Sequence, residues 1–348
     1  MKIFSKKGFL SRINLVCTLV GLLFPAPSLA QTRLRLATLL PVGSSQYKTL
    51  QEMGQKWNLT TAGAVTLTIY AGGTMGSERD CVMRMRAGQL QAATLSVDGL
   101  SDIDPAVGAV QKIPMLYNSL EEMEYVRVHL QPDLEQRLEK KGFVVLSWAD
   151  AGWIHIFSRH AYSHPQEFVA AKNKLFVTAG DQDETQIVNG LGLQAVPLEW
   201  TDVLTSLQTG LVDTIAATPF LALAGQLDLV AKNALDLKYV PLVGATVMTK
   251  KSWDALSPEV REKLKAHSLA AGAKIQAQSR AENQEAIKAM QARGLKLHQV
   301  TPELEAEWRK FLEAVYPTIR GKMVPADVFD KSLQLIAEYR HSHEAGRP

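Results

Sequence analysis

Short apolar runs rich in β-branched residues alternate with helix-period stretches along most of the chain, and this alternation limits the possible folds more than any other feature. The runs are four to six residues long, a length that suits buried strands better than helices. Strands that alternate with helices build sheets covered by helices. The sequence therefore predicts an α/β fold. The expected strands are Leu34–Thr38, Val65–Tyr70, Phe143–Leu146, Ile154–Phe157, Lys174–Val177 and Ala245–Met248.

Two segments of the chain repeat one supersecondary pattern. In residues 82–95 and 203–215 a helical stretch ends at a glycine, Gly88 or Gly210, and an apolar strand follows within a few residues. Glycine suits the left-handed conformation that often ends a helix. The recurrence predicts two similar α/β lobes.

The last hundred residues are dominated by helical patterns. Ser257, Pro258 and Glu259 supply an N-cap, a first-turn proline and a first-turn acid, and no breaker follows until Gly294. A helix over residues 258–293 would be about 54 Å long, so we expect it to lie across both lobes. Further helices are expected to start at Pro302 and near Pro325, and the polar residues 341–348 are expected to fray.

The first thirty residues have the organisation of a secretory signal peptide. Basic residues precede an apolar run, Ile13–Phe24, and small residues flank a cut after Ala30. Twelve apolar residues are too few for a membrane-spanning helix, which needs about 20. We therefore expect export to the periplasm and no membrane insertion after the signal is removed. Cys81 is then the only thiol in the mature chain and is expected to be a buried structural residue.

The charge of the whole chain is misleading about its partners. The formal charge is +3, but residues 1–30 hold four of the 38 basic residues and no acid. The rest of the chain carries 34 basic and 35 acidic residues. A nearly neutral mature chain gives no support to nucleic-acid binding.

The sequence contains no recognisable catalytic or metal-binding constellation. It lacks a nucleophile elbow, a P-loop and an HExxH motif, so we expect no enzyme and no cofactor. Residues 72–76 are glycine-rich, follow a strand and could present backbone amides to an anion, but a tight strand-to-helix turn is the preferred interpretation. His155, His160 and His164 have no cysteine or helical histidine partner at metal-ligand spacing, so we expect no metal site.

Large aromatic side chains near strand ends, with isolated acids beside them, are the main candidates for ligand contact. Ligands of open α/β sheets bind in the crevice beyond the carboxyl ends of the strands. The acids Asp98, Asp150 and Asp181 lie near these positions in the sequence. The full set of candidate ligand-binding residues is Phe176, Trp200, Trp153, Thr218, Phe220, Asp98, Trp148, Asp150, Asp181, Leu40 and Met75.

A series of motifs in a fixed order resembles one protein family. From Leu34 to about Tyr339 the chain is similar to the substrate-binding subunit of TRAP (tripartite ATP-independent periplasmic) transporters, dicarboxylate-binding type. The segments that carry the resemblance are Leu36–Thr38 with Pro41–Tyr47, Gly73–Arg79 with Arg86–Gly88, Ile113–Tyr117, Gly142–Leu146 with Gly152, Ser206–Asp213 and Lys251–Glu259.

The resemblance implies an architecture and a role. It implies a two-lobed periplasmic binding protein of the Venus-flytrap kind, with one long helix spanning both lobes. Such a protein closes on a small molecule and delivers it to a membrane permease that an ion gradient drives. The expected lobes are residues 31–152 with about 241–282, and residues 153–240 with about 283–340, followed by a tail, 341–348.

The chain departs from the family pattern where the ligand is held. Members generally bind a carboxylate with an arginine in a Lys-Leu/Ile-Arg-Val strand, where Phe176 stands here. A second arginine of many members falls at Ile154. Thr218 replaces the asparagine of an Asn-Pro motif, and Trp200 replaces a phenylalanine.

These replacements bear on the ligand. A buried carboxylate without a cation costs several kcal/mol, so we expect an apolar, aromatic or weakly polar ligand instead of a simple carboxylate. A cationic ligand is the next possibility, because indole faces and carboxylates together attract cations. Two alternatives stay open: a periplasmic sensor or partner-binding module of the same fold, and an atypical organic-acid binder.

Overall fold

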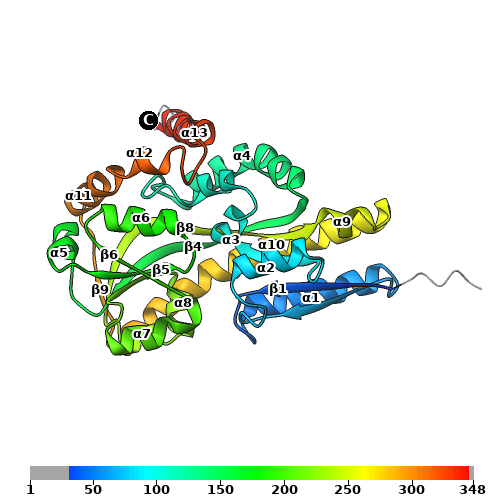
Figure 1. The fold of residues 1–348 in the computed structure, drawn as a ribbon, viewed down its shortest axis with the longest axis horizontal. Coiled ribbons are helices and arrows are strands. Elements are labelled where there is room, and N and C mark those ends of the chain that lie inside the picture. The colour runs from blue at the N-terminus through cyan, green and yellow to red at the C-terminus, as the bar shows by residue number, and fades with distance from the viewer. Residues whose placement is uncertain (1–30, 345–348) are drawn as a thin grey trace, which may run out of the picture. The chain divides into compact units, whose positions relative to one another are not determined.

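The computed structural model describes residues 31–344. The predicted signal peptide and its cut after Ala30 lie outside the described residues. Across the described range, no helix is long and apolar enough to cross a membrane. The chain has the predicted α/β architecture, with helices packed on a mixed sheet (Figure 1).

The strands form one hydrogen-bonded sheet in the order β2-β1-β3-β8-β4-β7-β5-β6, and β9 pairs with β8. Two long antiparallel strands, β4 and β8, connect a group made of β1 to β3 with a group made of β5 to β7. The strands are β1 (Thr32–Thr38), β2 (Val65–Tyr70), β3 (Ala92–Ser96), β4 (Phe143–Ser158), β5 (Lys174–Thr178), β6 (Gln194–Leu198), β7 (Thr214–Ala217), β8 (Asn233–Thr249) and β9 (Lys296–His298).

The structure confirms the expected strands and joins two of them. Phe143–Leu146 and Ile154–Phe157 are the two ends of β4, whose pairing with β8 shifts register between Asp150 and Trp153. Gly152 lies in this irregular stretch with φ +75°, a conformation that glycine adopts without strain. The residues between the two predicted strands therefore form an irregular stretch within one continuous strand.

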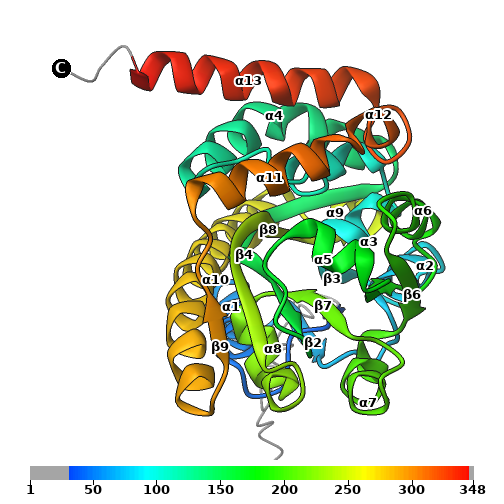
Figure 2. The same cartoon turned by 90° about the vertical axis from the view of Figure 1, so that its left-hand side faces the viewer.

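Helices cover both faces of the sheet (Figure 2). Three short 3-10 turns, η1 (Pro105–Val110), η2 (Trp200–Asp202) and η3 (Leu227–Leu229), complete the connections. The α-helices are α1 (Ser45–Thr60), α2 (Glu78–Arg86), α3 (Val97–Ser101), α4 (Leu120–Lys140), α5 (Pro165–Ala170), α6 (Gln182–Gly190), α7 (Val203–Thr209), α8 (Pro219–Ala224), α9 (Lys250–Asp254), α10 (Pro258–Ala292), α11 (Pro302–Glu313), α12 (Tyr316–Ile319) and α13 (Ala326–Glu344).

The predicted long helix is α10, which spans 35 residues and is about 52 Å long. The Ser257 side chain caps its first turn by accepting from the Val260 backbone N–H at 3.3 Å. The helix packs against α1, β4 and α8. It therefore contacts elements beside both strand groups.

The helix–glycine–strand repeat is present in both halves. Gly88 and Gly210 each have φ +74°, after α2 and α7 respectively, and β3 and β7 follow them. Both predicted C-terminal helices, α11 and α13, are also present. The expected fraying of residues 341–348 is wrong for 341–344, because α13 continues to Glu344 and His343 stacks on Tyr339 with ring centroids 3.9 Å apart. Residues 345–348 lie outside the described residues.

Candidate functional site

A cavity of about 1090 Å³ opens between the two strand groups. The first group contributes Leu40, after β1, and Asp98 on α3. The second contributes Phe176 on β5 and Trp200 in η2. Both strand groups therefore supply residues to one cavity, as expected for a ligand site at strand ends.

Most of the sequence-predicted site residues line this cavity. Seven of the eleven do so: Leu40, Asp98, Asp150, Phe176, Asp181, Trp200 and Thr218. Thr218 has mainly a structural role in the cavity wall, because its hydroxyl caps α8 by accepting from the Leu221 N–H at 3.4 Å.

The other four candidates do not line the cavity, for packing reasons. Trp148 belongs to the apolar core, and its indole N–H donates to Glu135 at 3.0 Å. Trp153 and Met75 are half-buried against the same core. On α8 the residue that lines the cavity is Leu221 instead of Phe220, since neighbouring helical residues point about 100° apart.

Phe176 and Trp200 form an aromatic wall. Their ring centroids are 6.0 Å apart and the rings meet edge to face at 71°, a favourable arrangement for aromatic pairs. Both side chains are half-buried and pack against the core between β7 and α7. The two rings therefore present an apolar surface to the cavity, and the core between β7 and α7 packs behind them.

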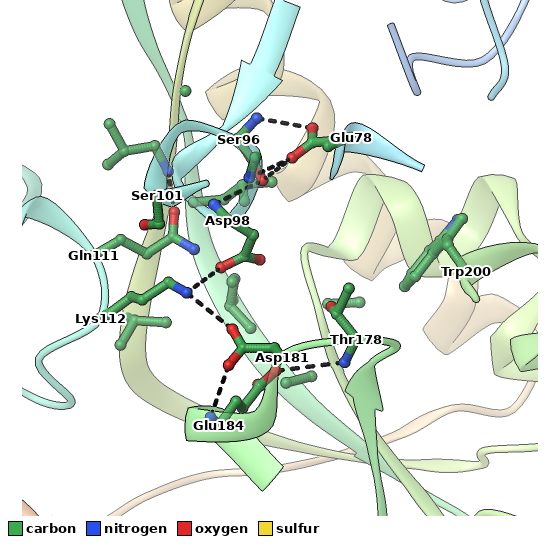
Figure 3. Close-up of a pocket in the computed structure, with 18 of the residues that line it drawn as sticks. Glu78, Ser96, Asp98, Ser101, Gln111, Lys112, Thr178, Asp181, Glu184 and Trp200 are labelled. Atoms are coloured by element: carbon green, nitrogen blue, oxygen red, sulfur yellow. Dashed lines mark hydrogen bonds and ion pairs between the residues drawn. The ribbon is translucent and has the colours of Figure 1, made fainter. Parts of the chain in front are cut away.

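Lys112 forms a charged bridge across the cavity (Figure 3). Its Nζ lies 3.2 Å from Asp98 Oδ1 and 3.0 Å from Asp181 Oδ2. Asp98 lies on α3 beside the first strand group, whereas Asp181 caps α6 beside the second. Burial disfavours the ammonium, but the two carboxylates outweigh it and raise the pKa of Lys112 above its ordinary value.

Glu184 adds a third carboxyl group to this cluster. Its Oε2 accepts weakly from the Thr178 backbone N–H at 3.4 Å. Burial raises the pKa of Glu184 to about 8, and the charges of Asp98 and Asp181 act in the same direction. At neutral pH the Glu184 side chain is therefore mostly protonated.

Glu78 organises the segment that carries Asp98. Its carboxylate accepts from the Ser96 N–H at 2.8 Å, the Ser96 hydroxyl at 2.6 Å and the Gly99 N–H at 3.0 Å. Burial raises the pKa of Glu78 to about 6, although the Ser96 hydrogen bonds oppose the shift. A Cβ at position 99 would lie 2.7 Å from the Glu78 Cβ, so this approach requires glycine.

Asp150 lines the cavity, but α10 occupies its carboxylate. The side chain is buried, and Arg280 donates to both carboxylate oxygens at 2.9 and 2.7 Å. The Gly152 N–H donates to the same group at 3.0 Å. Asp150 therefore joins α10 to the irregular stretch of β4 and has little capacity left for a ligand.

The cavity wall has a strong excess of acids. Among the described residues that line it, nine are acidic and three are basic, Arg79, Lys112 and Lys322. Arg79 donates to the Gly180 carbonyl at 3.2 Å, and Lys322 to Gln186 at 3.5 Å. Each of the three cations in the described wall thus already has a partner.

Sequence reasoning missed Lys112, Glu184 and Glu78. Lys112 and Glu184 lie outside any motif, and Glu78 belongs to the Gly73–Arg79 segment but carried no site prediction. Only the fold brings the three side chains to one cavity. Cys81, by contrast, is the buried residue that was predicted, and burial raises the pKa of its thiol to about 11. Within residues 31–344 no group of three or more His, Cys, Asp or Glu side chains is placed so that it could hold a metal ion.

Comparison with known proteins identifies the family. Residues 36–322 match the family described as bacterial extracellular solute-binding protein, family 7. The chain belongs to this family. Its members are binding proteins of TRAP transporters, so the chain is a solute-binding protein and not an enzyme. The C4-dicarboxylate-binding periplasmic protein of Rhodobacter capsulatus is 23% identical over 79% of this chain and 81% of its own.

Solved structures share the two-lobed fold. A TRAP periplasmic solute-binding protein from Ralstonia eutropha, with bound (S)-2-acetolactate, has a TM-score of 0.81 at 22% identity, covering 88% of this chain and 99% of its own. A sugar acid binding protein from Advenella mimigardefordensis, in complex with galactonate, has a TM-score of 0.81 at 18% identity, covering 88% and 98%. At these identities the likeness concerns the fold alone.

Proposed function

We propose that this chain is a periplasmic solute-binding protein that captures an apolar, aromatic or weakly polar molecule and delivers it to a TRAP-type permease driven by an ion gradient. The observation that carries the ligand class is the wall of the cavity. Its described cations all have partners, and its acids outnumber them three to one.

The electrostatics of the wall support this choice. A carboxylate ligand would lie among like charges and would compete with Asp98 and Asp181 for Lys112. Like charges at close range disfavour such a ligand, and burial without a cation adds several kcal/mol. The aromatic wall of Phe176 and Trp200 offers apolar contact instead. The acids bound by the solved neighbours therefore differ in class from the ligand proposed here.

The proposal extends to processing and lobe boundaries. The signal peptide would direct export and be removed by cleavage after Ala30. Lobe I would comprise residues 31–152 and about 241–282, and lobe II residues 153–240 and about 283–340. The irregular stretch at Gly152 and the crossing of α10 support a boundary there. The ligand would bind between the lobes.

Titration calorimetry on residues 31–348 tests the ligand class. We expect the parent chain to bind galactonate and (S)-2-acetolactate weakly or not at all. Phe176→Arg supplies a planar cation at the aromatic wall and should raise affinity for both acids about 10-fold to 100-fold. Phe176→Leu is the control, since it removes the ring without adding charge.

The opposite result would refute the ligand class. Tight binding of either acid by the parent chain, unchanged in Phe176→Leu, would show that a carboxylate is held elsewhere. Mass spectrometry of small molecules released from the purified protein gives an independent reading. A neutral apolar compound supports the proposal, whereas an organic acid contradicts it.

A further inference from the structure

The cavity reaches both faces of strand β5. Successive side chains of a strand point to opposite faces, so Asn173 and Leu175 face away from Phe176 on the same segment. All three line the cavity. The cavity therefore continues past the aromatic wall to the other side of the sheet.

This continuation has walls of its own, and we call it the inner arm. It is defined by Phe168, Asn173, Leu175, Leu191, Leu193 and Trp308, which all line the cavity. They come from α5, the residue before β5, β5 itself, the segment after α6, and α11. Phe168 is 3% and Trp308 4% exposed. The Trp308 indole N–H is already satisfied, because it donates to the Ser163 carbonyl at 2.8 Å.

Asn173 is the exception in this apolar surround. It is 1% exposed, and neither its Oδ1 nor its Nδ2 has a hydrogen-bond partner in residues 31–344. Its backbone is fully used, since its N–H donates to Phe168 and its carbonyl accepts from Gln194. Buried amides are normally satisfied, and an unsatisfied one is destabilising.

Asn233 shows what an ordinary buried asparagine looks like in the same protein. It is 8% exposed. Its Nδ2 donates to the Arg159 carbonyl at 3.4 Å, and its Oδ1 lies 3.0 Å from His298 Nε2. Asn233 therefore has a structural role that explains its polarity. The protein supplies Asn173 with no comparable partner.

We propose that the inner arm binds an apolar part of the ligand, and that the Asn173 amide hydrogen-bonds a neutral polar group on that part. A hydroxyl group fits best, because it can accept from Nδ2 and donate to Oδ1. This inference rests on the proposed function, since it assumes a largely apolar ligand. It adds a second compartment and a specificity-determining residue to the site.

A matched pair of small probes tests the inner arm. 1-Hexanol and 1-chlorohexane have the same apolar chain, but only the alcohol donates a strong hydrogen bond. Binding to residues 31–348 is followed by displacement of the neutral dye N-phenyl-1-naphthylamine. Asn173→Leu, which keeps the approximate volume, should weaken 1-hexanol about 5-fold to 10-fold and leave 1-chlorohexane unchanged or tighter.

Two further variants make the test specific. Asn233→Leu, outside the cavity, should leave the affinity of both probes unchanged. Leu191→Trp should fill the inner arm and weaken both probes at least 10-fold, with circular dichroism verifying the fold. Should Leu191→Trp not fold, Leu193→Phe serves the same purpose with a smaller increase in volume.

The outcomes separate this inference from the proposed function. The role of Asn173 is refuted if Asn173→Leu weakens the binding of both probes equally or of neither probe. The absence of any effect is expected if a bound water satisfies the amide. If the parent chain binds neither probe, or blocking the arm has no effect, the inner arm is refuted. The proposed ligand class fails separately, if the calorimetry finds tight carboxylate binding that is independent of Phe176 or if mass spectrometry finds a bound organic acid.

Discussion

Lys112 lies between two carboxylates that the chain brings together from distant segments. Asp98 and Asp181 hold its ammonium at 3.2 and 3.0 Å, and the partly buried Glu184 lies beside them. Sequence patterns predicted Asp98 and Asp181 as candidates because both follow strands. They could not predict Lys112 or Glu184, because neither belongs to a motif and their environment depends on tertiary packing. The aromatic pair was predictable from its position near strand ends.

Glu184 makes stability depend on pH. Its pKa is about 8 in the folded protein against 4.5 in the reference state, so the folded state binds the extra proton between these values. The contribution of Glu184 to the free energy of unfolding is therefore most favourable below about pH 4.5 and is lost as the pH rises towards 8. Glu184→Gln should remove this decline. The full shift corresponds to about 4 kcal/mol at pH 8, and we expect about 2 kcal/mol because the Glu184 side chain is only partly buried.

Thermal unfolding of both proteins from pH 5 to 8 provides the measurement. Glu78 has a folded pKa of about 6, so part of the decline below pH 7 should persist in Glu184→Gln. Asp183→Asn, an exposed neighbour on α6, is the control and should keep the parent profile. An unchanged profile in Glu184→Gln would mean that Glu184 is ionised in the folded protein at neutral pH.

At the scale of elements, β4 and α10 are joined where β4 is irregular. Arg280 on α10 makes a bidentate ion pair with the buried Asp150. Asn283, one turn further on, donates to the Ala151 carbonyl. The sequence predicted both ends of β4 and the extent of α10 from local patterns. Their joining was not predictable, because local patterns indicated two separate short strands and the continuous pairing with β8 is a long-range contact.

Removing the arginine should leave Asp150 buried without its cation. Arg280→Met should destabilise the protein by about 2–4 kcal/mol, less than for a fully buried pair because the Arg280 side chain is 33% exposed. Chemical denaturation measures the loss. Lys288→Met, which breaks an exposed pair with Glu285 on the same helix, should cost no more than about 0.5 kcal/mol.

A double variant identifies the cause of the loss. Asp150→Asn in the Arg280→Met background removes the uncompensated charge and should restore part of the stability. If the double variant is no more stable than Arg280→Met, lost packing of the arginine side chain would explain the effect. The ion pair would then contribute little.

At the scale of the whole molecule, two strand groups surround one cavity and a single long helix contacts both sides. The repeated helix–glycine–strand pattern predicted two similar lobes, the helical pattern of residues 258–293 predicted α10, and the family resemblance implied a cleft between the lobes. Edge strand β6 was not predicted, because Pro197 interrupts its pattern, and proline is tolerated at sheet edges. The continuation of the cavity behind β5 was also beyond sequence reasoning, because it depends on how helices pack above the sheet.

The Lys112 bridge should favour the closed arrangement of the two sides. Asp181→Asn retains an oxygen that can cap α6, a bond now made from the Glu184 N–H at 2.8 Å, but removes the charge that Lys112 contacts. Because this pair is partly buried, its loss should shift the ligand-free protein towards an open form and weaken ligand binding about 3-fold to 10-fold. Small-angle X-ray scattering should give a larger radius of gyration for Asp181→Asn than for the parent chain. The control Asp183→Asn should keep the radius of the parent chain. Equal radii for Asp181→Asn and the parent chain would show that contacts other than the bridge hold the two sides together.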